Sequence, residues 1–259
     1  MQNRQKCYEN VWILSGTSDG PIIAKELLSL NYIVFVSVIS YKASCAYPEN
    51  PKLHIITGKL LGQSKIKNFI LENEIDCVID ATHPFALKIS SDLNNVCQTI
   101  KMDLFRFERG LNLSARNKTI ISNVYDIRNI DLEGKNLLLA IGSRALNDVS
   151  KHYLDHGVNV FARVLATPES VLNAFATSIK NSNIAIFNPS KTNCGSLEKE
   201  LCKYWKIDYV LCRDSGGYSQ LLWERICQEG DIQLFLVKRP EPINKLSIFS
   251  TYNELLDNF

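Results

Sequence analysis

The stretch between Val11 and Gly20 constrains the fold of this chain more than any other. Four apolar residues, VWIL, lead into a short polar turn with two glycines, and a segment with apolar residues at helical spacing follows at once. This order predicts a buried strand, a tight turn and a helix. The amide groups and positive dipole end at the N-terminus of such a helix attract anions, and a nucleotide phosphate is a usual occupant.

The turn itself supports two interpretations. It carries only Gly16 and Gly20, so the full glycine-rich fingerprint of dinucleotide-binding proteins is absent, and the turn could join strand and helix without binding anything. The hydroxyl groups of Ser15, Thr17 and Ser18 favour a phosphate, because they add side-chain donors where a longer glycine loop would offer only backbone amides. We therefore expect a phosphate-binding turn here.

A hydroxyl and a lysine follow the second predicted strand, residues 32–39. In a dinucleotide-binding fold the end of this strand meets the adenosine ribose. Ser40 and Lys42 stand there without an Asp or Glu, which suits a 2′-phosphate better than a free 2′-hydroxyl and favours NADP over NAD. The alternative is a surface loop in which the lysine is incidental.

The densest motif of the chain, DATHPFA, spans residues 80–86 at the end of another apolar segment. Open α/β sheets place ligands at the carboxyl ends of their strands, so Asp80, Thr82 and His83 are candidates for a ligand site. Pro84 stands where a new helix can begin, because its missing amide is not needed there. A histidine on such a rim is a better functional candidate than one on the apolar face of a helix.

Strands and helices alternate along the whole chain, which predicts parallel sheets. We expect an α/β fold of two doubly wound, Rossmann-like domains that face a cleft, with roughly five strands each. The polar stretch 111–120 is the best linker, so we place the boundary within 111–135. Residues 1–120 are then an N-terminal NADP-binding domain, and residues 121–259 a C-terminal α/β domain that completes the substrate cleft. Residues 243–259 are poorly patterned and could pack on either half. The expected strands cover residues 11–14, 32–39, 53–57, 75–80, 102–107, 136–141, 159–164, 184–187, 209–213 and 233–237.

Composition excludes several classes of protein. The chain has 259 residues, a net charge of +2 and no basic tail or stripe, so nucleic acid is not an expected partner. No apolar run approaches the ~20 residues of a membrane-spanning helix, and the first ten residues lack the apolar centre of a signal peptide. The eight cysteines form no Cys-x-x-Cys pair, so we expect reduced thiols in a cytoplasmic protein without a metal site.

Eight short motifs follow one another in a recognisable order: Ser15-Gly-Thr-Ser-Asp19, Gly58-Lys-Leu60, Asp80–Ala86, Arg106-Phe-Glu-Arg109, Ile141-Gly-Ser143, Ala162-Arg-Val-Leu165, Asp214-Ser-Gly-Gly217 and Lys238-Arg-Pro240. Their order resembles that of the precorrin-6A reductase family of the cobalamin pathway, and the resemblance covers almost the whole chain. Two positions depart from the family pattern. Ser15 replaces the first glycine of a Gly-Gly-Thr turn, which bears on how closely a cofactor approaches. Asn188-Pro-Ser190 stands where the family usually has Gly-Pro-Phe, which bears on the substrate site.

The resemblance implies reduction of one carbon–carbon double bond of the precorrin-6A macrocycle with NADPH, giving precorrin-6B or its cobalt form. The catalytic candidates are His83 and Asp80, because of their place at the carboxyl end of a predicted strand. The implied cofactor-binding residues are Gly16, Thr17, Ser18, Asp19, Ser40, Lys42, Gly58, Ala81, Thr82 and Pro84. The implied substrate-binding residues are Phe85, Arg109, Ser143, Arg144, Arg163, Arg213, Ser215, Gly216 and Gly217. We expect a monomer or homodimer that binds a small-molecule tetrapyrrole and neither nucleic acid nor membrane.

The chemistry of this reaction agrees with the residue types present. Arginines suit a macrocycle with several carboxylates, because a guanidinium pairs with a carboxylate through two hydrogen bonds. We expect about half of the candidate arginines, which include Arg239, to be ordinary surface residues. No nucleophile is needed, because the nicotinamide supplies a hydride. A proton must also arrive from His83, Asp80, Asp214 or water, and we favour water or His83.

Two other functions compete with this interpretation. A non-catalytic nucleotide sensor could share the fold, but it would not need arginines at the rims of its second half. A sugar-nucleotide enzyme of the extended dehydrogenase type would need a Tyr-x-x-x-Lys pair. Neither Tyr204 nor Tyr218 is followed by a lysine four residues later, which counts against that class.

Overall fold

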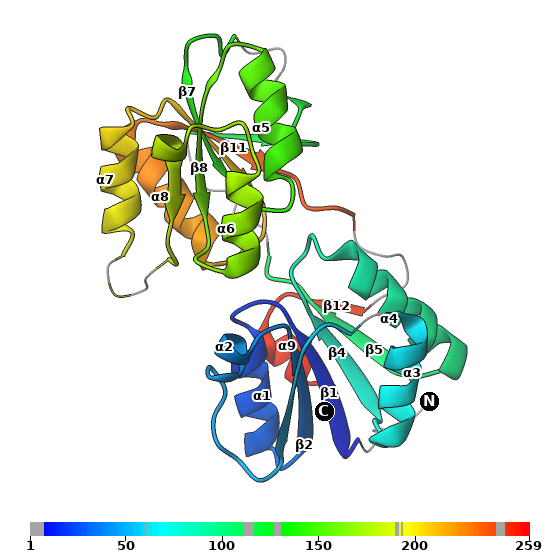
Figure 1. Cartoon of the computed structure of the whole chain (residues 1–259). Coiled ribbons are helices and arrows are strands. Elements are labelled where there is room, and N and C mark those ends of the chain that lie inside the picture. The colour runs from blue at the N-terminus through cyan, green and yellow to red at the C-terminus, as the bar shows by residue number, and fades with distance from the viewer. Residues whose placement is uncertain are drawn as a thin grey trace. The chain divides into compact units, whose positions relative to one another are not determined.

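The computed structural model describes residues 8–60, 62–110, 117–126, 131–189, 192, 194–241 and 247–259. The chain forms two compact units, which are shown in Figure 1. Unit 1 combines Met1–Gly110 with Pro240–Phe259, and unit 2 is Leu111–Arg239. The last twenty residues of the chain therefore return to the first unit.

The sheet of unit 1 has six strands in the order β12-β5-β4-β1-β2-β3, and all its neighbours are parallel. The order reverses between β1 and β4, because the chain leaves β1 towards β2 on one side and returns to β4 on the other. Ligands of open α/β sheets bind beyond the carboxyl ends of the strands at such a point. The strands are β1 (Asn10–Ser15), β2 (Ile33–Val38), β3 (Leu53–Thr57), β4 (Cys77–Ala81), β5 (Asp103–Phe107) and β12 (Ser247–Phe249).

Helices cover both faces of this sheet, as the alternation of side chains along β1 requires. Val11 and Ile13 point to the face that packs against α1 and the C-terminal helix α9, whereas Trp12 and Leu14 point to the face covered by α3 and α4. The indole of Trp12 donates to the Ser37 hydroxyl at 2.9 Å, so its polar atom is satisfied inside the core. The helices are α1 (Gly20–Ser29), α2 (Tyr41–Ser44), α3 (Gln63–Glu72), α4 (Leu87–Ile100) and α9 (Tyr252–Leu256).

Unit 2 repeats the same plan with the order β6-β11-β10-β7-β8-β9, again with every pair parallel. Its order reverses between β7 and β10. The strands are β6 (Lys118–Ile121), β7 (Asn136–Ala140), β8 (Asn159–Val164), β9 (Ile184–Ile186), β10 (Tyr209–Arg213) and β11 (Gln233–Val237). The helices are α5 (Leu146–Asp155), α6 (Pro168–Phe175), α7 (Ser196–Tyr204) and α8 (Tyr218–Gly230), with a short 3₁₀ turn at Asn181–Asn183.

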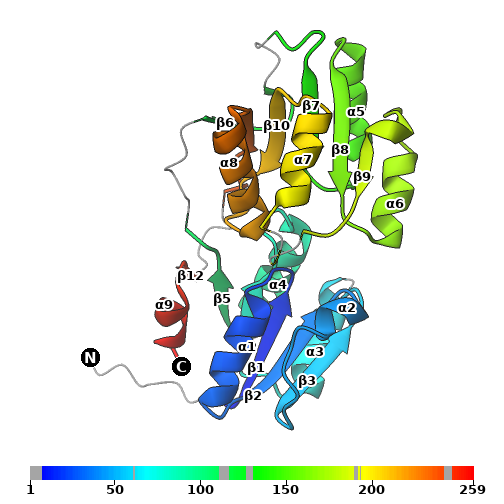
Figure 2. The ribbon, with the colours of Figure 1, turned by 90° about the vertical axis from the view of Figure 1, so that its left-hand side faces the viewer.

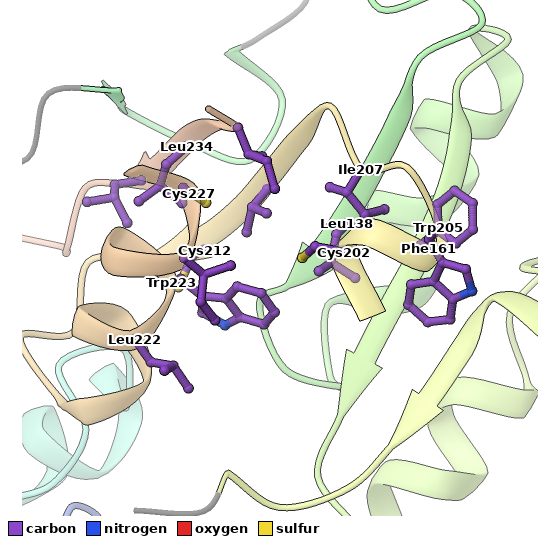
Figure 3. Packing of buried hydrophobic residues seen from close by; sticks show 14 residues of the cluster. Leu138, Phe161, Cys202, Trp205, Ile207, Cys212, Leu222, Trp223, Cys227 and Leu234 are labelled. Carbon is purple, nitrogen blue, oxygen red and sulfur yellow. The ribbon is translucent and has the colours of Figure 1, made fainter. Parts of the chain in front are cut away.

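One face of the second sheet packs against α7 and α8, and α5 and α6 cover the other (Figure 2). Figure 3 shows the packing beneath α7 and α8, where Trp223 and Cys202 meet side chains of the strands. Burial raises the pKa of the Cys202 and Cys212 thiols to about 12, so they stay protonated and fill space as apolar side chains. None of the seven cysteines that the structure describes forms a disulfide.

The predicted α/β fold of two doubly wound parallel sheets is confirmed, and all ten expected strands are present, although each sheet has six strands rather than five. Two short strands were not expected. β6 begins inside the predicted linker, and β12 lies in the poorly patterned C-terminal stretch. The assignment of residues 121–259 to the second domain is wrong at both ends, because β6 pairs with β11 in unit 2 and β12 pairs with β5 in unit 1. Leu255 of α9 is fully buried against the core of unit 1, which explains why this segment returns there.

No helix in the described parts of the chain is long and apolar enough to cross a membrane.

Candidate functional site

Two loops lie against each other at the point where the strand order of unit 1 reverses. The amide of Gly16, after β1, donates to the carbonyl of Ala81 at the end of β4 over 3.3 Å. A Cβ atom on Gly16 would lie only 3.1 Å from the amide nitrogen of His83 and 3.3 Å from Cα of Thr82. Gly16 therefore allows the loop after β1 to approach the loop after β4, which brings together the two motifs that the sequence marked as cofactor-binding.

A buried ion pair between β4 and β5 supports the loop after β4. Asp80 and Arg106 are partners across β4 and β5, and the Arg106 Nη1 lies 2.7 Å from the Asp80 Oδ1. The same carboxylate oxygen accepts from the amide and the hydroxyl of Thr82, at 3.0 and 2.7 Å. Arg106 also donates to the hydroxyls of Thr82 and Ser90, at 3.0 and 3.3 Å.

Glu108 completes this cluster. Its Oε1 accepts from Nε of Arg106 at 2.9 Å, so the guanidinium lies between two carboxylates. Asp80 is fully buried, and its Oδ2 has no hydrogen-bond partner among the residues that the structure describes. Asp80, expected as a catalytic residue, and Thr82, expected as a cofactor ligand, thus both form part of the support of the loop. Arg106 and Glu108 belong to one of the eight sequence motifs, but no role was expected for either.

His83 sits above this support with its ring partly exposed. Its Nδ1 accepts a hydrogen bond from the amide of Phe85 at 3.2 Å, so in the neutral ring Nε2 carries the proton. The rings of His83 and Phe85 lie 5.7 Å apart in a tilted arrangement. Pro84 between them is buried, and the Ala86 amide closes the turn on the His83 carbonyl at 2.7 Å. The loop therefore fixes which nitrogen of His83 acts as donor.

Asp19 is the hub of the turn between β1 and α1. Its Oδ1 accepts from Nε of Arg109 and from the hydroxyl of Tyr252, both at 2.7 Å, and its Oδ2 accepts from the Thr17 hydroxyl at 2.9 Å. Arg109 also donates to the hydroxyl of Ser18 at 3.2 Å. Burial opposes the charge of Arg109, but Asp19 and Tyr252 outweigh it, so the pKa of the guanidinium is raised. Arg109, expected to bind substrate, therefore lies at the N-terminus of α1 beside the expected cofactor residues.

Gly20, the first residue of α1, has no room for a side chain. A Cβ there would lie 2.0 Å from Oγ of Ser15 and 2.5 Å from the hydroxyl of Tyr47. The glycine that this turn requires most strictly is thus Gly20, although the sequence pointed to Gly16. The serine that departs from the family pattern, Ser15, is one of the groups that fill this space.

The loops after β2 and β3 carry the remaining expected cofactor residues. The Ser40 hydroxyl accepts from the amide of Ala43 at 3.3 Å and so caps the short helix α2. Lys42 follows on this helix with its side chain exposed. Gly58, after β3, donates to the carbonyl of Val38 at 2.9 Å with a φ of 127°, a backbone conformation that favours glycine.

Unit 2 gathers most of the expected substrate-binding residues at its own reversal point, between β7 and β10. Gly142 after β7 lies beside Arg213 at the end of β10, because a Cβ on the glycine would be 3.7 Å from Nη1 of the arginine. Burial and the like charge of Arg144 lower the pKa of Arg213. The Ser143 hydroxyl donates to the Ser170 hydroxyl and accepts from the side-chain amide of Asn173, both at 3.3 Å.

The side chain of Gln220, which no sequence motif marked, shapes the loop after β10. The Gly216 amide donates to Oε1 of Gln220 at 2.6 Å, and the Gln220 amide group donates to Glu224 at 3.0 Å. Glu224 pairs in turn with Lys118 of β6 at 3.2 Å. Gly216 has a φ of 68°, so this loop uses the conformational freedom of glycine. Gly217 completes the loop by donating to the Ser215 hydroxyl at 3.4 Å.

The other candidate arginines of unit 2 differ in their surroundings. Arg163 is buried, lies 3.7 Å from Glu198, and packs over the ring of Phe187 at 4.9 Å. Burial lowers its pKa. Arg144 is largely exposed and pairs with Glu169 at 3.2 Å. Arg163 therefore belongs to the interior, and Arg144 to the surface.

These two reversal points define an α/β protein of the Rossmann-like class with a built loop cluster in each unit. The chain belongs to the precorrin-6x reductase CbiJ/CobK family, whose profile matches residues 10–259. The resemblance that the motifs predicted is thereby confirmed, and the protein is a member of a reductase family of cobalamin biosynthesis.

Individual relatives agree with this assignment. A cobalt-precorrin-6A reductase of Synechocystis sp. is 27% identical over 90% of this chain and 89% of its own length. A cobalt-precorrin-6A reductase of Methanocaldococcus jannaschii is 26% identical over 95% of this chain and 96% of its own. The solved structure of CobK precorrin-6A reductase has a TM-score of 0.77 and 19% identity, covering 96% of this chain and 95% of that one, which supports the fold.

Proposed function

We propose that this protein reduces one carbon–carbon double bond of precorrin-6A, or of its cobalt complex, to the corresponding precorrin-6B, with NADPH as the reductant. The observation that carries the proposal is the family match over residues 10–259. The two relatives above are named cobalt-precorrin-6A reductase and align over nearly their whole length. Those names suggest the substrate class.

The residues of unit 1 fit an NADPH molecule at the reversal point between β1 and β4. The exposed Gly16 and Ser18 precede α1, whose N-terminal amides and dipole suit a pyrophosphate. Exposed Lys42, after β2, suits the 2′-phosphate. The loop with His83 touches the first turn, and we place the nicotinamide beside it. When bound, the nicotinamide supplies the hydride.

The chain's own residues then position the reactants and help to deliver the proton to the macrocycle. Arg106 and Asp80 hold the loop that carries His83. The candidate proton donors are His83 in its doubly protonated form, which becomes the neutral ring after the transfer, and water, to which Nε2–H of the neutral ring can donate a hydrogen bond. We assign Asp80 a positioning role, because it is fully buried and paired with Arg106.

In unit 2, Arg213 and Arg144 at the other reversal point suit carboxylates of the macrocycle. Phe85 and Arg109 of unit 1 stay candidates for binding the substrate. The expectation that the two domains face a common cleft stays a prediction, as do the cytoplasmic location and the monomeric or homodimeric state.

The reaction is tested by mixing the purified protein with NADPH and precorrin-6A, or cobalt-precorrin-6A, and following the loss of NADPH absorbance. We expect oxidation only when one of the two macrocycles is present, and the comparison shows which of them is the substrate. Binding of NADPH with no turnover of either macrocycle would contradict the proposal and favour the nucleotide sensor.

The cofactor is tested with Lys42→Glu. We expect wild-type protein to bind NADPH more tightly than NADH, and the variant to lose roughly 10-fold or more in NADPH affinity, the value of one charged hydrogen bond. Lys67→Glu on α3 is the matched control, because it makes the same charge change at another exposed lysine. Equal dissociation constants for the two cofactors in calorimetry would refute the preference.

A further inference from the structure

The C-terminal segment reaches the predicted cofactor turn through one side chain. Tyr252, the first residue of α9, stacks its ring on Phe107 with centroids 5.0 Å apart and planes 10° apart. Its hydroxyl donates to Oδ1 of Asp19 at 2.7 Å, across 233 positions of the chain. The stack fixes the ring, so the hydroxyl is aimed at the carboxylate by the packing of α9.

Asp19 depends on such donors. Its side chain is almost fully buried, and a buried carboxylate is costly unless its oxygens accept hydrogen bonds. Tyr252, Arg109 and Thr17 each supply one. One of these donors, Thr17, belongs to the turn that precedes α1, and its hydroxyl also accepts from the backbone amide of Asp19 at 3.2 Å, so the position of the carboxylate and the shape of the turn are linked.

The donor is a stable one. Burial and the bond to Asp19 raise the pKa of the Tyr252 hydroxyl, so it keeps its proton at neutral pH. Arg109 shares the same carboxylate oxygen and also reaches the Ser18 hydroxyl. A loss of the Tyr252 bond therefore acts on the residues that face the expected pyrophosphate.

We infer that Tyr252 is a positioning residue for the turn between β1 and α1. Through it, the docking of residues 247–259 on unit 1 sets the geometry of the cofactor-binding turn. The effect on NADPH rests on the proposed function, whereas the effect on the turn does not. No residue of the C-terminal segment was singled out from the sequence.

A second tyrosine provides a matched control. The hydroxyl of Tyr32 donates to the carbonyl of Phe259 at 2.6 Å, so it also ties the C-terminal segment to unit 1 with one hydrogen bond. That bond does not touch Asp19. Tyr252→Phe and Tyr32→Phe each remove one hydroxyl and keep the ring, so both variants retain the aromatic packing.

Two measurements on the full-length protein test the inference. Hydrogen–deuterium exchange without cofactor reports on the amides of residues 17–20, 22 and 23, and calorimetry reports the dissociation constant for NADPH. We expect Tyr252→Phe to speed exchange in this turn and to raise the dissociation constant roughly 10-fold, as the loss of a hydrogen bond to a charged group allows. Tyr32→Phe should change neither.

The outcomes separate this inference from the proposed function. If the wild-type protein does not bind NADPH but the turn of the Tyr252→Phe variant exchanges faster, the positioning role is supported and NADPH is refuted as the cofactor. Unchanged exchange in Tyr252→Phe overturns the inference. An equal effect of Tyr32→Phe also overturns it, because docking of the segment as a whole would then be responsible. If the wild-type protein binds NADPH, faster exchange in Tyr252→Phe with an unchanged dissociation constant overturns it as well.

Discussion

Arg106 is the residue on which the loop after β4 depends. Its guanidinium lies between Asp80 and Glu108 and also donates to two hydroxyls, and only 4% of its side chain is exposed. A buried charge that loses its partner is strongly destabilising, whereas an exposed ion pair contributes little. The two kinds of pair can be compared within this chain.

We expect Arg106→Met to lower the free energy of unfolding by about 3–5 kcal/mol, because it leaves two carboxylates uncompensated. Arg144→Met is the control, since its pair with Glu169 is largely exposed, and it should cost less than ~1 kcal/mol. Urea denaturation measures both. A loss of less than ~1 kcal/mol in Arg106→Met would show that Asp80 and Glu108 are not held by this arginine.

His83 is expected to act in turnover rather than in stability. His83→Ala removes a partly exposed ring, so the melting temperature should change little, while single-turnover NADPH oxidation should slow by up to ~100-fold, as misplaced reactants do. His54→Ala is the control, because it removes another histidine ring, which lies on β3 and stacks on the ring of Phe35 with centroids 4.8 Å apart. A variant that melts early but reacts at the wild-type rate would make His83 a structural residue.

At this scale the sequence pointed to the loop 80–86 as a candidate site, but not to the buried ion pair that supports it. The segment 80–86 stood out because polar residues end an apolar strand. That Asp80 is buried could not be foreseen, because its partner Arg106 lies 26 positions later on the neighbouring strand. Tyr252 and Gln220 were missed for a similar reason, since a lone tyrosine or glutamine shows its partner only after the chain has folded.

At the scale of elements, the apolar patterns predicted every strand except two short ones, β6 and β12. β9 is equally short, but its three residues are all apolar, whereas β12 begins with a serine and the four residues of β6 begin with a lysine and a threonine. The turn before α1 was recognised from its glycines, but which of them is under the tighter constraint depends on the packing of Ser15 and Tyr47, which lie apart in the sequence.

We expect Gly20→Ala to destabilise the protein by about 1–3 kcal/mol, because the new methyl group would overlap Ser15 and the hydroxyl of Tyr47. Gly110→Ala is the control, since no described atom lies within 4 Å of the added Cβ there, and it should be neutral or slightly stabilising. Urea denaturation of both variants checks this. Equal stabilities would mean that the turn can open to accept a side chain.

At the scale of the whole molecule, the chain crosses between its two units twice, because unit 2 is inserted between β5 and β12 of unit 1. Sequence patterns predicted two domains with a boundary within 111–135, and the second unit begins at Leu111, at the first end of that range. They could not assign the C-terminus, because a short amphipathic helix would suit either sheet. Its place is decided by contacts such as Leu255 with the core of unit 1.

This topology predicts that substitutions of two buried leucines have opposite effects on the two units. Leu255→Ala on α9 and Leu222→Ala on α8 should each cost about 2–5 kcal/mol, because both side chains are almost fully buried. In hydrogen–deuterium exchange, Leu255→Ala should lower the protection of β1 and leave β7 unchanged, and Leu222→Ala should do the reverse. A domain of residues 121–259 would instead place both leucines in one unit, so both variants would lower the protection of β7. Loss of protection at β7 in Leu255→Ala, with β1 intact, would therefore restore that boundary and remove the physical link between the C-terminal segment and the cofactor turn.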